Sequence, residues 1–64
     1  MIRIPQTVSS LAHTTAGDVS RVTTALSGVT TRAGLIGAEM ALKRAADNVR
    51  ELRSHVRVLK RAAV

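Results

Sequence analysis

The side chains that could perform acid–base chemistry or bind a metal are few and widely spaced. The chain has two histidines, His13 and His55, and no cysteine. Neither histidine has a second histidine or a cysteine at the spacing of zinc ligands. Without cysteine, no disulfide can staple the fold either. We therefore expect no metal site, no cofactor and no catalytic histidine.

The four acidic residues give no stronger sign of catalysis. Asp47 and Glu51 are four residues apart, the spacing of neighbours on a helix surface, where nearby basic side chains can pair with them. The glycines of residues 34–37 lack the Lys-Ser/Thr pair and the preceding strand of a phosphate-binding loop. A chain of 64 residues with these features is not expected to be an enzyme.

Composition predicts a single small domain, residues 1–64, that depends on partners. The sequence contains no Phe, Trp or Tyr, so Leu, Ile, Met and Val are its largest apolar side chains. Domains near this size bury only about 60% of the surface of the unfolded chain. Residues 1–33 contain eleven of the twelve Ser and Thr residues, whereas residues 34–64 contain seven of the ten Lys and Arg residues.

A heptad pattern in the second part is the clearest structural signal. Its first and fourth positions are apolar over four repeats, without proline and without glycine after Gly37, which predicts a helix over residues 34–61 with a coiled-coil seam. The predicted oligomer seam comprises Leu35, Ala38, Leu42, Ala45, Val49, Leu52, Val56 and Leu59.

The first part carries a weaker helical pattern. Apolar or small residues recur at alternating spacings of four and three from Val8 to Ile36, which predicts a helix over residues 6–31. Many of these residues are Val and Thr, which are poor helix formers. A break at residues 16–18 is compatible with the pattern, with Asp18 as the N-cap of the segment that follows.

Two helices of similar length predict an all-α antiparallel hairpin that turns near residues 31–34. The apolar stripe of the first part and the heptad of the second are out of register, which requires a turn or a stutter between them. One long, kinked helix is the alternative, because the small residues of 33–41 would also let two helices approach closely without a turn.

The residues that flank the seam favour antiparallel over parallel self-association. A parallel dimer would bring no opposite charges together, whereas an antiparallel pair can place Glu39 opposite Arg53 or Lys60 of a second copy. Each such exposed pair contributes less than about 1 kcal/mol. The alternative is that the stripe packs on the first helix of the same chain.

The net charge of +6 points to an acidic partner. Regularly spaced bases on the second helix could contact phosphates without reading sequence, and the lack of aromatics excludes stacking on single-stranded bases. The competing interpretations are a merely solvated face and an anionic membrane surface. The candidate polyanion contacts are Lys43, Arg50, Arg53, Arg57, Lys60 and Arg61.

These features together predict a non-enzymatic structural or assembly protein, a coat-like or nucleoid-like subunit that forms homo-oligomers and contacts nucleic acid. The alternatives are an accessory or regulatory subunit that docks its amphipathic helix on a larger protein, and an amphipathic helix that associates with an anionic membrane. The sequence shows neither a secretory signal nor the run of about 20 apolar residues needed for a membrane span. A location inside the cell or within a viral or other large assembly is expected.

Overall fold

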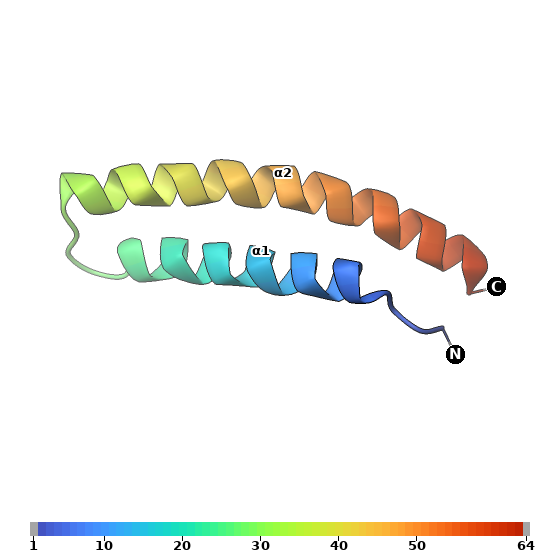
Figure 1. Ribbon diagram of the computed structural model, residues 1–64. Helices are drawn as coiled ribbons and strands as arrows, with labels where there is room; N and C mark the ends of the chain where they lie inside the picture. Colours follow the sequence, from blue (N-terminus) through green and yellow to red (C-terminus); the bar gives the residue numbers. More distant parts are fainter. Residues whose placement is uncertain (1, 64) are drawn as a thin grey trace.

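Two helices form the structure, a computed structural model that describes residues 2–63 (Figure 1). Helix α1 spans Gln6–Ala25 and helix α2 spans Arg32–Ala62. They lie side by side in opposite directions, so that both ends of the chain are at the same end of a rod measuring 47 × 17 × 16 Å. The predicted all-α antiparallel hairpin is confirmed, and the chain is not one continuous helix.

The first helix is shorter than predicted, because the chain turns six residues earlier than the apolar pattern indicates. α1 begins at Gln6, as expected, but ends at Ala25 and not at residue 31. Gly28 has φ = +108°, a backbone conformation that side-chain-bearing residues rarely adopt and that a right-handed helix cannot contain. Residues 26–31 therefore form the connection between the helices.

The second helix begins two residues earlier than predicted, at Arg32. Thr31 is extended, and its side-chain hydroxyl accepts a hydrogen bond of 3.1 Å from the backbone N–H of Gly34. This N-cap satisfies one of the donors that every helix leaves free at its start. α2 ends at Ala62, one residue after the predicted end.

Hydroxyl groups within α1 bond to the helix itself, which explains how so many Ser and Thr residues fit into it. Such a hydroxyl donates to the carbonyl oxygen four residues earlier. These bonds are Thr14 to Ser10 (3.0 Å), Thr15 to Leu11 (2.8 Å), Thr23 to Val19 (3.0 Å) and Thr24 to Ser20 (3.1 Å). The helix continues through residues 16–18, so the predicted break there, with Asp18 as an N-cap, is wrong.

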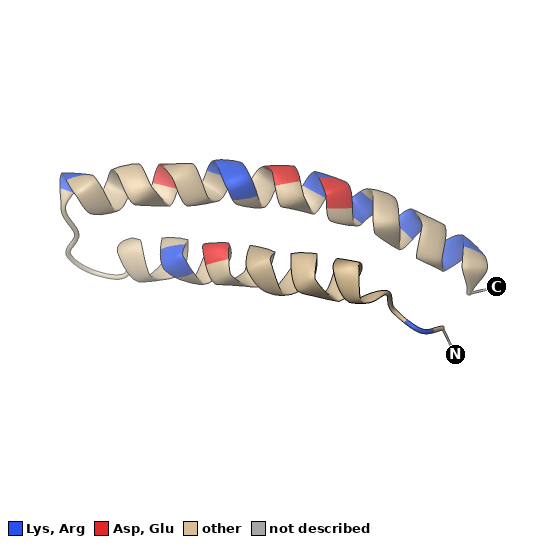
Figure 2. Cartoon of the chain, viewed as in Figure 1, with Lys and Arg blue, Asp and Glu red and all other residues tan. Residues whose placement is uncertain are grey.

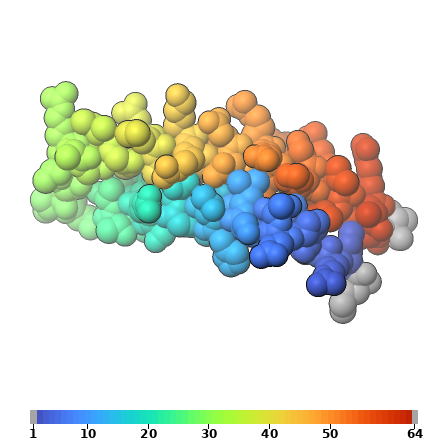
Figure 3. All heavy atoms as spheres, viewed as in Figure 1, coloured from blue at the N-terminus to red at the C-terminus, as the bar shows by residue number. Residues whose placement is uncertain are grey.

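Each helix contacts the other through residues at heptad spacing, and in α2 many of these residues are small. Ala38, Ala41 and Ala45 are buried, with exposed fractions of 3–6%. Alanines at these positions let the two backbones approach closely, and Figure 3 shows the helices packed together along the length of α1. The inner residues of α1 are Val8, Leu11, Thr15, Asp18, Val22 and Ala25, and those of α2 are Gly34, Ala38, Ala41, Ala45, Asn48, Leu52, His55 and Leu59.

Candidate functional site

The seam between the helices divides the hairpin surface into two long sides with different chemistry. On one side lie residues that directly precede an inner residue, such as Thr14 before Thr15 and Arg44 before Ala45. On the other side lie residues that directly follow an inner residue, such as Val19 and Leu42. In antiparallel helices these rows of α1 and α2 come to lie next to each other. The polar side carries Thr7, Thr14, Arg21, Gly37, Arg44, Glu51 and Val58. The apolar side carries Ala12, Val19, Leu26, Leu35, Leu42, Val49 and Val56.

An ion pair ties the two helices together from the polar side. The Arg44 Nε lies 3.1 and 3.0 Å from the two carboxylate oxygens of Asp18, and its Nη2 lies 2.7 Å from Oδ1. Asp18 is 3% exposed, whereas half of the Arg44 side chain reaches solvent. The pair therefore fixes which residues of α1 lie opposite which residues of α2.

The same contact shifts the ionisation of both groups. Hydrogen bonds from Arg44 hold the pKa of the Asp18 carboxyl below its ordinary value, against the opposing effect of burial. The nearby positive charge of Arg21 acts in the same direction. Hydrogen bonding to Asp18 in turn raises the pKa of Arg44. The carboxylate is thus held in its charged form inside the hairpin.

Sequence reasoning missed this pair. It placed Asp18 at a helix start and did not include Arg44 among the candidate site residues. A signal was present, because Leu11, Asp18 and Ala25 are spaced by seven residues and so share one face of a helix. An acid on an inner row needs a basic partner, and Arg44 supplies it from α2.

The residues of the predicted oligomer seam divide between two surfaces. Ala38 and Ala45 are buried against α1, and Leu52 and Leu59 are half-buried on the same row. The other four lie on the apolar side with exposed fractions of 46–56%; they are Leu35, Leu42, Val49 and Val56. One row of the seam thus holds the hairpin together, while the other remains on its surface.

The predicted polyanion contacts lie on the surface of α2 that faces away from α1, or next to that surface. Lys43, Arg50 and Arg57 are seven residues apart on the outermost row, named here the outer basic row. Arg53 and Lys60 lie between this row and the apolar side, and Arg61 lies near the C-terminal end of α2. Figure 2 shows how basic residues follow α2 towards its C-terminal end, while α1 is nearly free of charge.

Within residues 2–63, Arg44 is the one basic residue of α2, among its Lys and Arg side chains, that forms an ion pair with an acid. All six predicted polyanion contacts are exposed and have no acidic partner in this part of the chain. Their charge is therefore available to an external anion.

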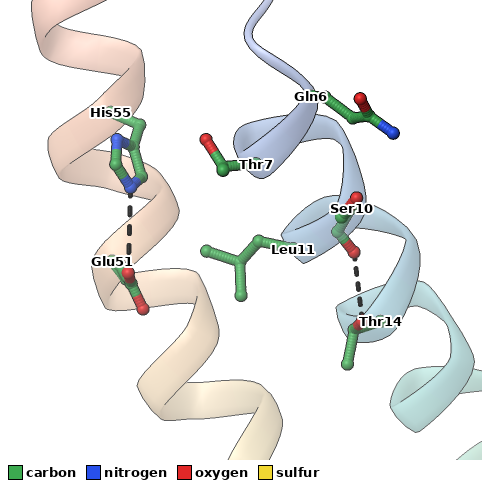
Figure 4. A pocket seen from close by; sticks show the side chains of 7 residues that line it. All are labelled: Gln6, Thr7, Ser10, Leu11, Thr14, Glu51 and His55. Atoms are coloured by element: carbon green, nitrogen blue, oxygen red, sulfur yellow. Dashed lines mark hydrogen bonds and ion pairs between the residues drawn. The ribbon is translucent and has the colours of Figure 1, made fainter.

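A shallow hollow on the polar side contains one of the two histidines (Figure 4). Its His55 Nε2 lies 3.8 Å from Glu51 Oε1, too far for a hydrogen bond. The Thr14 hydroxyl that lines the hollow donates to the backbone carbonyl of Ser10. Its lining residues are Gln6, Thr7, Ser10, Leu11, Thr14, Glu51 and His55. The hollow therefore presents hydroxyl groups and one imidazole, without a nucleophile hydrogen-bonded to a base among the described residues.

A second shallow groove lies on α2 between the apolar side and the outer basic row. Val49, Leu52 and Val56 form its apolar wall, and Arg53, Arg57 and Lys60 complete its lining. Nowhere in residues 2–63 do three or more His, Cys, Asp or Glu side chains come close enough together to hold a metal ion. Neither described helix is long and apolar enough to cross a bilayer.

Comparison with known proteins adds no assignment: no family model, no curated protein and no solved structure matches this chain.

Proposed function

We propose that the chain is a small helical assembly protein that binds nucleic acid, without sequence preference, through the outward surface of α2. The observation that carries the proposal is the set of exposed bases between Lys43 and Arg61 that have no acidic partner in the described chain. Arg44, by contrast, is used inside the hairpin. The proposed assembly combines this basic surface with self-association of the hairpins.

The spacing of the outer basic row suits a regularly charged polymer. Its members Lys43, Arg50 and Arg57 are separated by seven residues, which is about 10.5 Å along a helix. Successive phosphates of one DNA strand are about 3.4 Å apart along the duplex axis. The spacing between successive basic side chains of this row therefore matches that of every third phosphate. A helix that packs against α1 presents these charges without the entropy cost of folding on binding.

The same surface gives no means of reading a base sequence. The Lys and Arg residues are spread over several turns of α2. They are not concentrated at a helix N-terminus, where helices that read a DNA groove place their contacts. Without aromatic residues the chain cannot stack on unpaired bases. Binding should therefore depend on phosphate density and on salt concentration, and not on sequence.

The salt dependence of duplex DNA binding tests the proposal. Fluorescence anisotropy with a labelled duplex of arbitrary sequence gives the association constant between about 50 and 200 mM salt. Three to six phosphate contacts predict a slope of log K against log salt of about −3 to −5. Replacing two members of the outer basic row, Arg50→Gln with Arg57→Gln, should reduce that slope by about two.

A matched control shows whether binding depends on the position of the basic residues or only on the net charge of the chain. Arg3→Gln with Arg32→Gln removes the same amount of charge from exposed positions outside the proposed surface. The control should change the slope much less than the Arg50 and Arg57 replacements. Equal effects of the two pairs would contradict the located surface, and no binding at low salt would contradict the proposed function. Salt-sensitive binding to vesicles of anionic lipid, but not to duplex DNA, would favour the membrane alternative.

A further inference from the structure

The apolar side of the hairpin is a continuous surface with no cover from the chain itself. Val19, Leu26, Leu35, Leu42, Val49 and Val56 are 46–60% exposed. The Asp18–Arg44 pair sets the register of the helices, so that Val19 lies level with Leu42 and Leu26 level with Leu35. The apolar side chains of α1 and α2 therefore form one strip along the molecule. The strip continues past Val49 along α2.

The elongated hairpin exposes more surface than a compact protein of the same mass. The chain exposes 5396 Å². A compact monomeric protein of this mass, 6.8 kDa, exposes about 4,000 Å², so the hairpin exposes roughly 1,400 Å² more. A stable protein–protein interface covers about 800 Å² on each partner. The excess is thus sufficient for one such interface.

The α2 residues of this surface are arranged so that the surface complements a second copy of itself. The apolar side itself contributes Leu35, Leu42, Val49 and Val56, and the row beside it on α2 contributes Glu39, Ala46 and Arg53. When a two-fold axis passes through the contact at Ala46, Glu39 of each copy lies opposite Arg53 of the other copy, which gives two such pairs. It also brings Leu42 next to Val49 and Leu35 next to Val56 across the axis. Apolar residues meet apolar residues, Glu39 meets Arg53, and an alanine permits close approach at the centre. At the far ends of the same row, Arg32 comes opposite Lys60 of the other copy.

We propose that the apolar side binds a second copy of this chain, with the two α2 helices antiparallel and crossing at Ala46. The contact is isologous, as in most homodimers, because the same patch serves both partners. The proposal rests on the assembly role proposed above and specifies the surface that performs it. It does not depend on nucleic-acid binding, since the outer basic row of Lys43, Arg50 and Arg57 lies outside the contact. Of the six proposed polyanion contacts, Arg53 belongs to both surfaces.

The charges of the patch favour a second copy over a lipid surface. The patch carries one acid, Glu39, and one base, Arg53, so its net charge does not attract an anionic bilayer, whereas a second copy pairs the two. The patch also lacks the Trp and Phe side chains that anchor interfacial helices. On the α1 part of this side, no charged residue accompanies Ala12, Val19 and Leu26.

Sedimentation velocity of the purified chain tests the proposed dimer. The wild-type chain should be dimeric at about 100 μM, and Leu42→Gln with Val49→Gln should weaken the dimer by about 100-fold or more, because both copies lose apolar contacts. Met40→Gln with Val58→Gln is the matched control, since these two apolar residues are 67% and 64% exposed but lie off the apolar side. The control should leave the mass unchanged. Circular dichroism checks that all variants remain helical.

Charge exchange tests the antiparallel arrangement itself. Glu39→Arg alone places like charges opposite Arg53, and Arg53→Glu alone places like charges opposite Glu39, so each variant should dimerise about 10-fold more weakly. An equal mixture of the two variants restores both opposite-charge pairs in a heterodimer and should recover the wild-type mass. Failure of the mixture to recover, with both variants folded, would contradict the antiparallel contact.

A wild-type chain that stays monomeric at this concentration would overturn the proposed dimer, and so would a dimer that the Leu42 and Val49 replacements leave intact. In the first case the apolar side would instead fit the accessory-subunit alternative, in which a different protein covers it. Neither result would remove binding to duplex DNA. Failure of the dimer and failure of nucleic-acid binding are therefore measured separately.

Discussion

Replacing Ala41 by leucine should destabilise the hairpin, because this alanine is buried where the two helices meet. Ala41 is 3% exposed and lies on α2 between the buried residues Ala38 and Ala45. The change from a methyl to an isobutyl group forces the helices apart or into strained rotamers. Such overpacking costs about 1–3 kcal/mol. Leucine and alanine are both good helix formers, so a loss of stability would report on packing and not on helix propensity.

Thermal unfolding followed by circular dichroism measures this loss. A cost of 1 kcal/mol lowers the melting temperature of a domain of this size by about 4–8 °C, so Ala41→Leu should lower it by about 5–20 °C. Ala33→Leu makes the same chemical change at an exposed position of α2 and should change the melting temperature by only a few degrees. If Ala41→Leu melts at or above the wild-type temperature, the alanine row does not form the contact between the helices.

The remaining predictions concern the ion pair and two glycines. Because the pKa of Asp18 is lowered in the folded hairpin, the stabilisation from its pair with Arg44 is present above about pH 4 and is lost as the pH falls through the folded pKa. Asp18→Asn should therefore be less stable than wild type at pH 7 in urea unfolding, and its stability should fall less on acidification; an unchanged acid profile would contradict the role of the pair. Gly28→Ala should destabilise the hairpin by about 1–2 kcal/mol, because alanine is strained at positive φ. Gly17→Ala should stabilise it by up to about 1 kcal/mol, since Gly17 is in the middle of α1 with open space around it. Equal effects of the two glycine replacements would show that the loop conformation is not required.

The helices could be predicted because periodicity outweighs local propensity over long segments. The heptad of residues 35–63 identifies α2 almost to its ends. The end of α1 could not be read from the same pattern, since Val29 and Ala33 continue the spacing of α1 through the loop. The helix ends at Ala25, and the connection after it contains Gly28 at positive φ; a glycine in a sequence permits such a turn without requiring it.

The rotation of α2 against α1 could not be predicted from hydrophobicity. Ala41 and Leu42 are neighbours, and the larger leucine would gain more from burial, yet Ala41 is inside and Leu42 is half exposed. In this rotation Arg44 reaches the carboxylate of Asp18, and the small alanines lie between the helices. The pair joins residues 26 positions apart, so the pattern of a single helix does not contain it.

The structure keeps the residues of the predicted basic surface together but divides the residues of the predicted oligomer seam between two surfaces. The bases stay together on the outward part of α2, where spacing alone placed them. The seam splits, because its Ala38 row is needed against α1. The row of Leu42 thereby remains on the apolar side, the surface that we propose binds a second copy.

The mass of the purified chain in solution, alone and with a short DNA duplex, shows whether the hairpins pair and whether the pair binds nucleic acid. We expect a species of twice the 6.8 kDa chain mass without DNA, and the same dimer bound to the duplex at low salt. Sedimentation equilibrium measures both masses in one experiment. A monomer that leaves the mass of the duplex unchanged would contradict the account.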